Sequence, residues 1–314
     1  MSCLSNETLS LASARLIRLL SIPIVACFAL SVAAATEPPP IKQFHANGID
    51  LAYVEEGKGT TVVFVHGANG DWRSWELFRP AVAERYRYVS YSRRYHLPNP
   101  WPGDGSDYSF QLHAADLVAF IQGLNAGPVH LVGTSYGGFL VTLVALEHPE
   151  LLRSAVVNDP GVTELIADMP DGKPLVAERA KSFGEIKEVA LAGDNAKAAV
   201  LLYDWVEGEK GAFDKLSEAR RERFLANAST MRPMMSQPAP PSISCATLGK
   251  MKVPMLVTRG EHDNPFYVLN TDTFASCLPH GNRAAIIPNA AHVMGGNTAF
   301  GEAVLTFLAE HAEH

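Results

Sequence analysis

The sequence predicts an α/β fold in which a doubly wound, mostly parallel sheet carries a helical cap. Short β-branched runs alternate with helical segments up to residue 160, and the same alternation returns after residue 246. Strands that alternate with helices form parallel sheets covered on both faces. Residues 161–245 instead show charged helical patterns without strand signals. We therefore expect a core of residues 41–160 and 246–314, with a cap of residues 161–245 inserted after the sixth strand.

The first half of the core opens with a predicted hairpin. Residues 44–53 form two strand patterns joined at Asn47-Gly48, a pair that favours the positive φ angles of a tight turn. Four further apolar runs predict strands. These strands span residues 60–65, 86–91, 129–133 and 152–157. The helices expected between them span residues 107–124 and 137–147.

The cap and the second half of the core follow. The predicted cap helices span residues 175–189, 196–206 and 215–226, and a proline-rich turn at Pro238, Pro240 and Pro241 ends this segment. The strand and helix alternation then returns. Its predicted strands span residues 253–258 and 283–287, and its predicted helices span residues 267–278 and 298–313.

The N-terminus, residues 1–35, has the order of a secretory signal peptide. Arg15 and Arg18 precede a long apolar run, and Ala33-Ala34-Ala35 fits a small-residue cleavage site. We expect cleavage after Ala35, a secreted or periplasmic protein, and no stable membrane span once the leader is removed. Two alternatives are a retained membrane anchor, because the apolar run is long, and a lipoprotein attached at Cys27.

Charge and cysteine content restrict the partners. The net charge is −7 and no cluster of Lys and Arg stands out, which argues against nucleic-acid binding and leaves a small-molecule substrate as the expected partner. After leader removal Cys245 and Cys277 remain, and a disulfide and two separate buried thiols are both open. No Cys and His spacing fits a metal site, so we expect neither metal nor cofactor.

The segment Gly133-Thr134-Ser135-Tyr136-Gly137 joins a predicted strand to a predicted helix. A serine nucleophile on a parallel sheet must project from a sharp turn at the carboxyl end of a strand. Glycines two residues away on either side remove side chains that would collide in that turn. Ser135 is therefore the candidate nucleophile.

A serine hydroxyl needs a base, and the base needs an orienting carboxylate. His292 follows the last predicted strand and is the candidate base. Asp263 follows the penultimate strand and completes the chain order Ser, Asp, His, so we favour it as the orienting acid. Asp159, at the end of the strand after the nucleophile helix, is the alternative acid.

The oxyanion hole requires two N–H donors. One is expected from Tyr136, next after the nucleophile, and the other from Ala68, in the loop after an early strand.

The cap should determine the substrate, and flexible methionines would suit an apolar group. The candidate substrate-binding residues are Asn69, Trp72, Asn227, Met231 and Met235.

Three separated motifs make the chain resemble the α/β-hydrolase fold superfamily. They are VHGANG at residues 65–70, GTSYGG at residues 133–138, and the pair GEHD at 260–263 and PNAAH at 288–292. The resemblance covers the chain after the leader. It implies an eight-stranded, mostly parallel sheet, a helical cap and no required cofactor. The segment YSRRYH at residues 91–96 departs from the Asp-x-Arg-Gly pattern common in that family, which leaves the role of this loop open.

A serine nucleophile predicts an acyl-enzyme, and hence hydrolysis of a carboxylic ester or a lactone. The same triad also serves carbon–carbon bond hydrolysis of diketo acids and cofactor-free perhydrolysis, which remain alternatives. Similar proteins that open epoxides carry an aspartate in place of the serine, so Ser135 argues against that reaction. The intact triad argues against a non-catalytic ligand binder.

Overall fold

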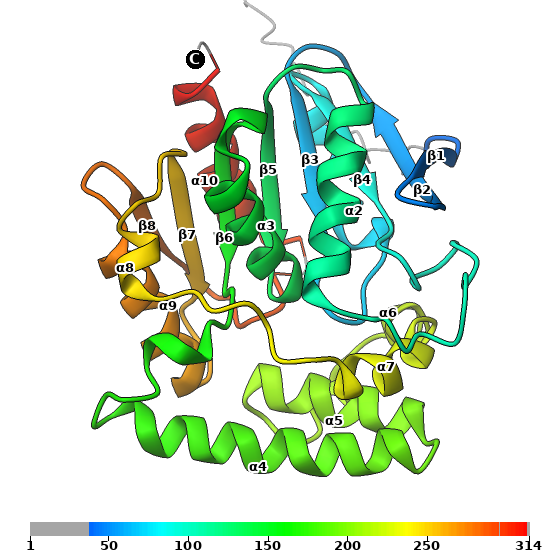
Figure 1. Ribbon diagram of the computed structural model, residues 1–314, viewed down its shortest axis with the longest axis vertical. Coiled ribbons are helices and arrows are strands. Elements are labelled where there is room, and N and C mark those ends of the chain that lie inside the picture. The colour runs from blue at the N-terminus through cyan, green and yellow to red at the C-terminus, as the bar shows by residue number, and fades with distance from the viewer. Residues whose placement is uncertain (1–37, 295, 313–314) are drawn as a thin grey trace, which may run out of the picture. The chain divides into compact units, whose positions relative to one another are not determined.

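The computed structural model describes residues 38–294 and 296–312, and the predicted signal peptide lies outside these residues. They contain an eight-stranded sheet in the order β1-β2-β4-β3-β5-β6-β7-β8 (Figure 1). The strands are β1 (Lys42–Ala46), β2 (Ile49–Glu56), β3 (Thr61–Val65), β4 (Arg87–Tyr91), β5 (Val129–Thr134), β6 (Leu152–Asn158), β7 (Met255–Gly260) and β8 (Arg283–Ile287). The pairs β1–β2 and β2–β4 are antiparallel and all others are parallel, which confirms the predicted sheet.

The hairpin between β1 and β2 turns at the predicted dipeptide. Asn47 and Gly48 have φ angles of 49° and 76°, both in the left-handed region. Two consecutive positive φ angles match the right-handed twist of the flanking strands. The turn therefore sets the register in which Ala46 pairs with Ile49.

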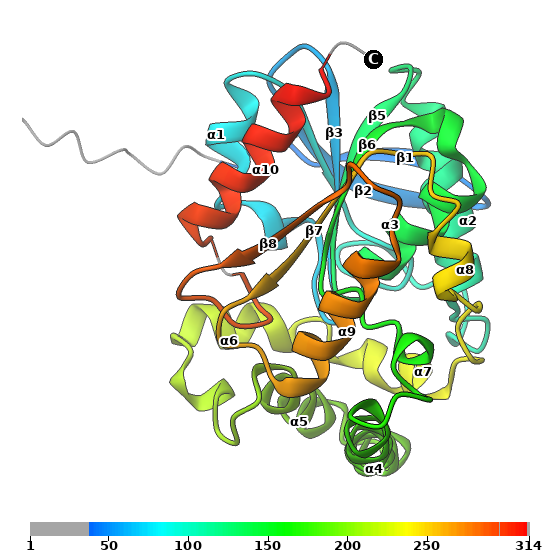
Figure 2. The same cartoon turned by 90° about the vertical axis from the view of Figure 1, so that its left-hand side faces the viewer.

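Helices cover both faces of the sheet. In Figure 2, α1 and α10 lie on one face and α2, α3 and α9 on the other. These helices are α1 (Arg79–Ala83), α2 (Phe110–Gly123), α3 (Tyr136–Glu147), α9 (Pro265–Cys277) and α10 (Thr298–Glu310). In β3, Val62 and Phe64 join one apolar cluster and Val63 and Val65 join the other. Successive side chains of a strand point to opposite faces, so an uninterrupted apolar run serves both layers.

The segment between β6 and β7 is helical and contributes no strand to the sheet. It holds α4 (Gly172–Leu191), α5 (Asn195–Glu207), α6 (Glu218–Leu225) and α7 (Met231–Ser236). Figure 1 shows these helices beyond one end of the strands. The predicted helix over 215–226 begins later, at Glu218, because Leu216 is extended with ψ of 148°. Within the described ranges, no helix is both long and apolar enough to cross a membrane.

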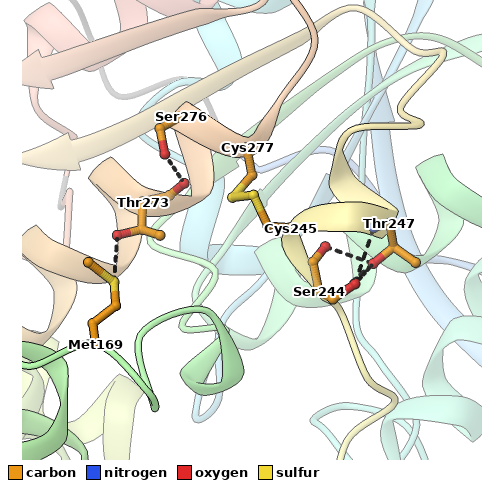
Figure 3. Close-up of a disulfide and its surroundings, with 7 residues drawn as sticks. All are labelled: Met169, Ser244, Cys245, Thr247, Thr273, Ser276 and Cys277. Atoms are coloured by element: carbon orange, nitrogen blue, oxygen red, sulfur yellow. Dashed lines mark hydrogen bonds between the residues drawn. A yellow bond between two sulfur atoms is a disulfide. The ribbon is translucent and has the colours of Figure 1, made fainter.

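A disulfide joins the last residue of the predicted cap segment to the core. Cys245 is the first residue of α8 (Cys245–Leu248) and Cys277 is the last of α9 (Figure 3). The two Cα atoms are 5.0 Å apart. Ser244 and Thr247 form a capping box at the start of α8, which satisfies backbone donors of this single turn. Of the two states left open for these cysteines, the bridged one is confirmed.

Candidate functional site

Ser135 occupies the turn between β5 and α3. Its φ and ψ angles are 54° and −121°, a region that residues with a side chain rarely adopt. The Ser135 N–H donates to the carbonyl of Asn158 at 2.8 Å, which ties this turn to the end of β6. Strained backbone of this kind persists where the surrounding structure holds it, and it concentrates at functional sites.

The glycines around Ser135 are required by close backbone approach. A Cβ on Gly133 would lie 2.5 Å from the carbonyl oxygen of Gly137. A Cβ on Gly137 would lie 2.3 Å from the carbonyl oxygen of Val65, at the end of β3. Real Cβ atoms do not come this close to backbone oxygens, so any side chain at these positions would displace the turn or β3. The nucleophile turn therefore packs directly against the strand that leads into the oxyanion loop, residues 66–70.

Arg93 holds the oxyanion loop, and the sequence did not single it out. Its guanidinium donates to the carbonyl oxygens of Gly67 and Ala68 at 2.9 and 3.2 Å. It also lies 4.3 Å from the ring centre of Tyr136, the other predicted oxyanion donor. Arg93 is only 1% exposed. It belongs to the YSRRYH segment. The departure of this segment from the family pattern was the one feature of the sequence that could have drawn attention to Arg93.

The surroundings of Arg93 are neutral and aromatic. No carboxylate of the described residues forms an ion pair with Arg93; it donates instead to Tyr108 Oη at 3.3 Å and to His113 Nδ1 at 3.1 Å. The backbone N–H of Arg93 donates to His66 Nε2 at 3.0 Å. Burial, and then the charge of Arg93, lower the pKa values of His66, to about 3, and of His113. These imidazoles are therefore neutral acceptors, and the guanidinium of Arg93 brings a positive charge to the oxyanion loop.

His292 lies beyond β8 and lines the same cavity as Ser135. It is 3% exposed, and its ring stacks on the ring of Tyr267 with centroids 4.0 Å apart. Burial lowers the pKa of His292, against the opposing charges of Asp263 and Glu207. The imidazole is therefore neutral near pH 7, the state in which it can accept a proton from a serine hydroxyl.

Both candidate acids lie beside His292, but at different distances. Asp159 Oδ2 is 3.3 Å from His292 Nδ1, whereas no ion pair within 4 Å joins Asp263 to His292 in the described part of the chain. Asp263 Oδ2 accepts the Gly260 N–H at 2.8 Å, and its Oδ1 is buried without a donor. The Asp159 contact is longer than an aligned hydrogen bond, as catalytic contacts often are before a substrate binds.

The two carboxyl groups interact with each other. Burial raises the pKa of Asp159 to about 7, although hydrogen bonds from Thr271 and Asp263 oppose the rise. Burial and then the charge of Asp159 raise the pKa of Asp263 to about 8. Two adjacent buried carboxyls cannot both ionise easily, so the pair favours a state in which the two groups share one proton.

Tyr267 is a second residue that the sequence did not reveal. It is the third residue of α9, buried, and stacked on His292. Burial raises the pKa of Tyr267, and a hydrogen bond with Ser135 opposes the rise. The phenol thus lies against both Ser135 and His292. One tyrosine among several in the chain carries no sequence signal of this placement.

A cavity of about 760 Å³ lies between the core and the cap, and several of the candidate catalytic residues line it. Ser135, Tyr136, Ala68 and His292 line it. The apolar part of its wall includes Phe110, Phe139, Phe183, Leu202, Val206 and Phe224. A cavity of this size and polarity fits a small organic molecule.

The predicted substrate-binding residues divide into two groups. Asn69 and Met235 line the cavity. Trp72 instead packs in the core cluster that contains Phe64, and Met231 is fully buried in the other cluster. Asn227 is bound elsewhere: its amide donates to Asp71 Oδ2 and accepts the Leu97 N–H, both at 2.8 Å. These three side chains therefore support the walls rather than form them.

Known proteins are similar to this chain in sequence. The 2-hydroxy-6-oxo-6-(2'-aminophenyl)hexa-2,4-dienoic acid hydrolase of Metapseudomonas resinovorans is 25% identical over 297 residues, which cover 90% of this chain and 96% of that protein. Bifunctional epoxide hydrolase 2 of Sus scrofa is 31% identical over 115 residues, 36% of this chain. The chain spans only 21% of the length of that protein.

Solved structures and a family profile give the same result. The crystal structure of carboxylesterase CesB from Bacillus subtilis has a TM-score of 0.67 with 18% identity, over 87% of this chain and 93% of that chain. At this identity the similarity shows a shared fold. The profile of the Alpha/beta hydrolase family matches residues 62–298, which is most of the described chain. The protein therefore belongs to the alpha/beta hydrolase family.

Proposed function

We propose that the protein is an exported serine hydrolase that cleaves a carboxylic ester or a lactone through an acyl-enzyme. The observation that carries this proposal is the placement of Ser135, at a positive φ of 54° on a strand-to-helix turn, in one cavity with His292. A serine held in that conformation presents its hydroxyl beyond the strand end. A neutral imidazole in the same cavity supplies the base.

In this reaction His292 takes the proton of the Ser135 hydroxyl as Oγ attacks the substrate carbonyl. The oxyanion that forms accepts hydrogen bonds from the N–H groups of Ala68 and Tyr136. His292 then donates its proton to the leaving alcohol, which departs and leaves the acyl group on Ser135. A water molecule, deprotonated by the same imidazole, hydrolyses this ester and frees the serine.

Asp159 is proposed as the carboxylate that orients His292, because it is the acid within 3.3 Å of Nδ1. Its ionised form stabilises the imidazolium that forms in each half-reaction. Asp263, with the higher pKa of the two, supports Asp159 by donating a hydrogen bond. This assignment reverses the preference that chain order alone suggested.

Carbon–carbon bond hydrolysis of a diketo acid is the second candidate. One observation favours it: the hydrolase of Metapseudomonas resinovorans, whose name states that its substrate is a hydroxy-oxo-dienoic acid, aligns with this chain over 96% of its length. Epoxide hydrolysis is not proposed, since we expect an aspartate as the nucleophile of that reaction, whereas this chain has Ser135.

The test is hydrolysis of p-nitrophenyl esters, from acetate to a long acyl chain, by the mature protein and by Ser135→Ala. We expect a burst of p-nitrophenol equal to the enzyme concentration, lost in Ser135→Ala, and a preference for acyl groups that fill the cavity. A folded protein that cleaves no ester but cleaves a hydroxy-oxo-dienoic acid would instead establish the second candidate.

Export is proposed from the N-terminal sequence alone. If the leader is cleaved after Ala35, the exported protein begins at Thr36. Cell fractionation followed by N-terminal sequencing measures this directly. Full-length protein retained in the membrane fraction, or acylated at Cys27, would replace the proposal with one of its alternatives.

A further inference from the structure

Arg179, on the cap helix α4, lines the cavity that contains Ser135. Its guanidinium forms no hydrogen bond or ion pair with any other residue in the described ranges. Glu178, its neighbour in sequence, accepts from Trp205 Nε1 and Ser182 Oγ. Glu164, which lines the same cavity, accepts from Ser242 and the Ile243 N–H. The described residues therefore offer Arg179 no anion.

The walls around Arg179 are aromatic. Its guanidinium carbon lies 4.0 Å from the ring centre of Phe183, 5.4 Å from that of Phe266 and 6.0 Å from that of Trp205. Aromatic faces stabilise a cation but accept none of the five N–H bonds of a guanidinium. Burial lowers the pKa of Arg179 from its ordinary value, yet arginine stays protonated in proteins. The result is a fixed charge with unfilled donors, held in an apolar wall.

This charge lies near the reacting groups. Arg179 and the hydroxyl of Tyr267 interact electrostatically, and Tyr267 in turn contacts Ser135 and stacks on His292. Apart from Arg179, the cation among the described cavity-lining residues is Lys187, an exposed residue. A single planar fork in an apolar wall matches a singly charged, planar carboxylate, which it can bind through two parallel hydrogen bonds.

We propose that Arg179 is a carboxylate subsite, and that the substrate is an apolar ester, lactone or diketo acid that carries one free acid group. The proposal rests on the proposed function, because it adds a substrate class to the same site. It assigns recognition of the charged end to the cap and bond cleavage to the core. No step of the chemistry passes through Arg179, which is a binding residue.

A matched pair of esters tests the proposal: mono-p-nitrophenyl adipate, which carries a carboxylate, and its methyl ester, which does not. We expect the wild-type protein to prefer the acid, and Arg179→Gln to lose about 10- to 100-fold in kcat/KM for the acid, through KM, with little change for the methyl ester. Arg179→Lys should recover part of the preference. The control is Lys181→Gln, which removes an exposed charge from the same helix and should keep the wild-type preference for the acid.

Equal losses on both esters in Arg179→Gln would show a structural role and overturn the proposal. A binding measurement tests the carboxylate subsite independently of the proposed ester hydrolysis. Calorimetric titration of Ser135→Ala with monomethyl adipate should detect binding that Ser135→Ala/Arg179→Gln lacks, and dimethyl adipate should not distinguish the two proteins. Such a difference without any ester hydrolysis would support the subsite and refute the esterase. Equal affinities of both proteins for monomethyl adipate would refute the subsite alone.

Discussion

At the scale of single residues, the paired aspartates give the sharpest prediction. Asp159→Asn should lower kcat by about 10²- to 10⁴-fold, because an amide can donate to His292 and favour the wrong tautomer. Asp263→Asn should cost far less, since an amide can still donate to Asp159 as the protonated acid does. Steady-state kinetics on both variants decide the assignment. A larger loss in Asp263→Asn would restore the order that the sequence alone favoured.

Arg93 is expected to act on the rate by positioning the oxyanion loop. Arg93→Lys cannot donate to Gly67 and Ala68 in the same geometry, so kcat should fall by up to about 10²-fold while KM changes little. Arg94→Lys is the control, because this neighbouring arginine pairs with Asp116 rather than with the loop. If both variants lose activity in proportion to their loss of stability, Arg93 has no positioning role.

The residues found only in the structure share a physical property. The positions of Ser135 and His292 after β5 and β8 were predictable, because local sequence specifies where a strand ends. Arg93, Arg179 and Tyr267 act through long side chains whose tips lie far from their own backbone. Where such a tip lies depends on elements distant in the sequence. Trp72 shows the converse, since it follows the oxyanion loop in sequence but packs in the core.

At the scale of elements, the disulfide between α8 and α9 predicts a measurable stability. The cysteines are 32 positions apart, and chain-entropy estimates for a loop of that length give roughly 3–4 kcal/mol. Cys245→Ser/Cys277→Ser should lower the free energy of unfolding by about that amount, and dithiothreitol should lower that of the wild type alone. Urea denaturation measures both. An unchanged midpoint would mean that the loop is already ordered in the unfolded chain.

Helices and strands were predictable where a single pattern of apolar residues dominates the local sequence. The short, β-branched runs of β3 and β5 favour buried strands, and the two-residue turn at Asn47-Gly48 is specified by its own chemistry. For the cap, only the helical structure was predictable. Amphipathic periodicity shows that a helix has an apolar face, but it does not show which other helix packs against that face. The short cap helix α7, which contains Pro233, was missed since proline usually ends a helix.

At the scale of the whole molecule, buried neutral histidines predict sensitivity to acid. Burial lowers the pKa of His66 to about 3 and of His130 to about 4, and lowers those of His96 and His113 well below 6.5. Between these values and 6.5 the unfolded chain binds more protons than the folded one. The contribution of these histidines to stability is therefore full above pH 6.5 and is lost as the pH falls, by at most about 1.4 kcal/mol per group and pH unit.

The paired aspartates oppose this trend. Their raised pKa values mean that the folded state binds more protons between about pH 4 and 8, so their contribution is lost as the pH rises. Four histidines outweigh two carboxyls, and the free energy of unfolding should fall between pH 6.5 and 5. The free energy of unfolding of the double variant Asp159→Asn/Asp263→Asn should fall more steeply over this pH range. Urea titrations at each pH measure this difference. A flat profile in the wild type would contradict the neutral state of the histidines.

The point where the chain leaves the sheet after β6 and returns to it at β7 has a consequence for the evolution of the protein. Asn158 ends β6 and pairs with Thr258 of β7, and their side chains are joined at 2.9 Å. The two strands that flank the cap are thus held together by the core itself. We therefore expect that a gene segment for the cap can be replaced while Ser135, Asp159 and His292 keep their places. Selection can then alter the wall with Arg179, the proposed acid-binding residue, independently of the proposed catalytic groups, one stretch of coding sequence at a time.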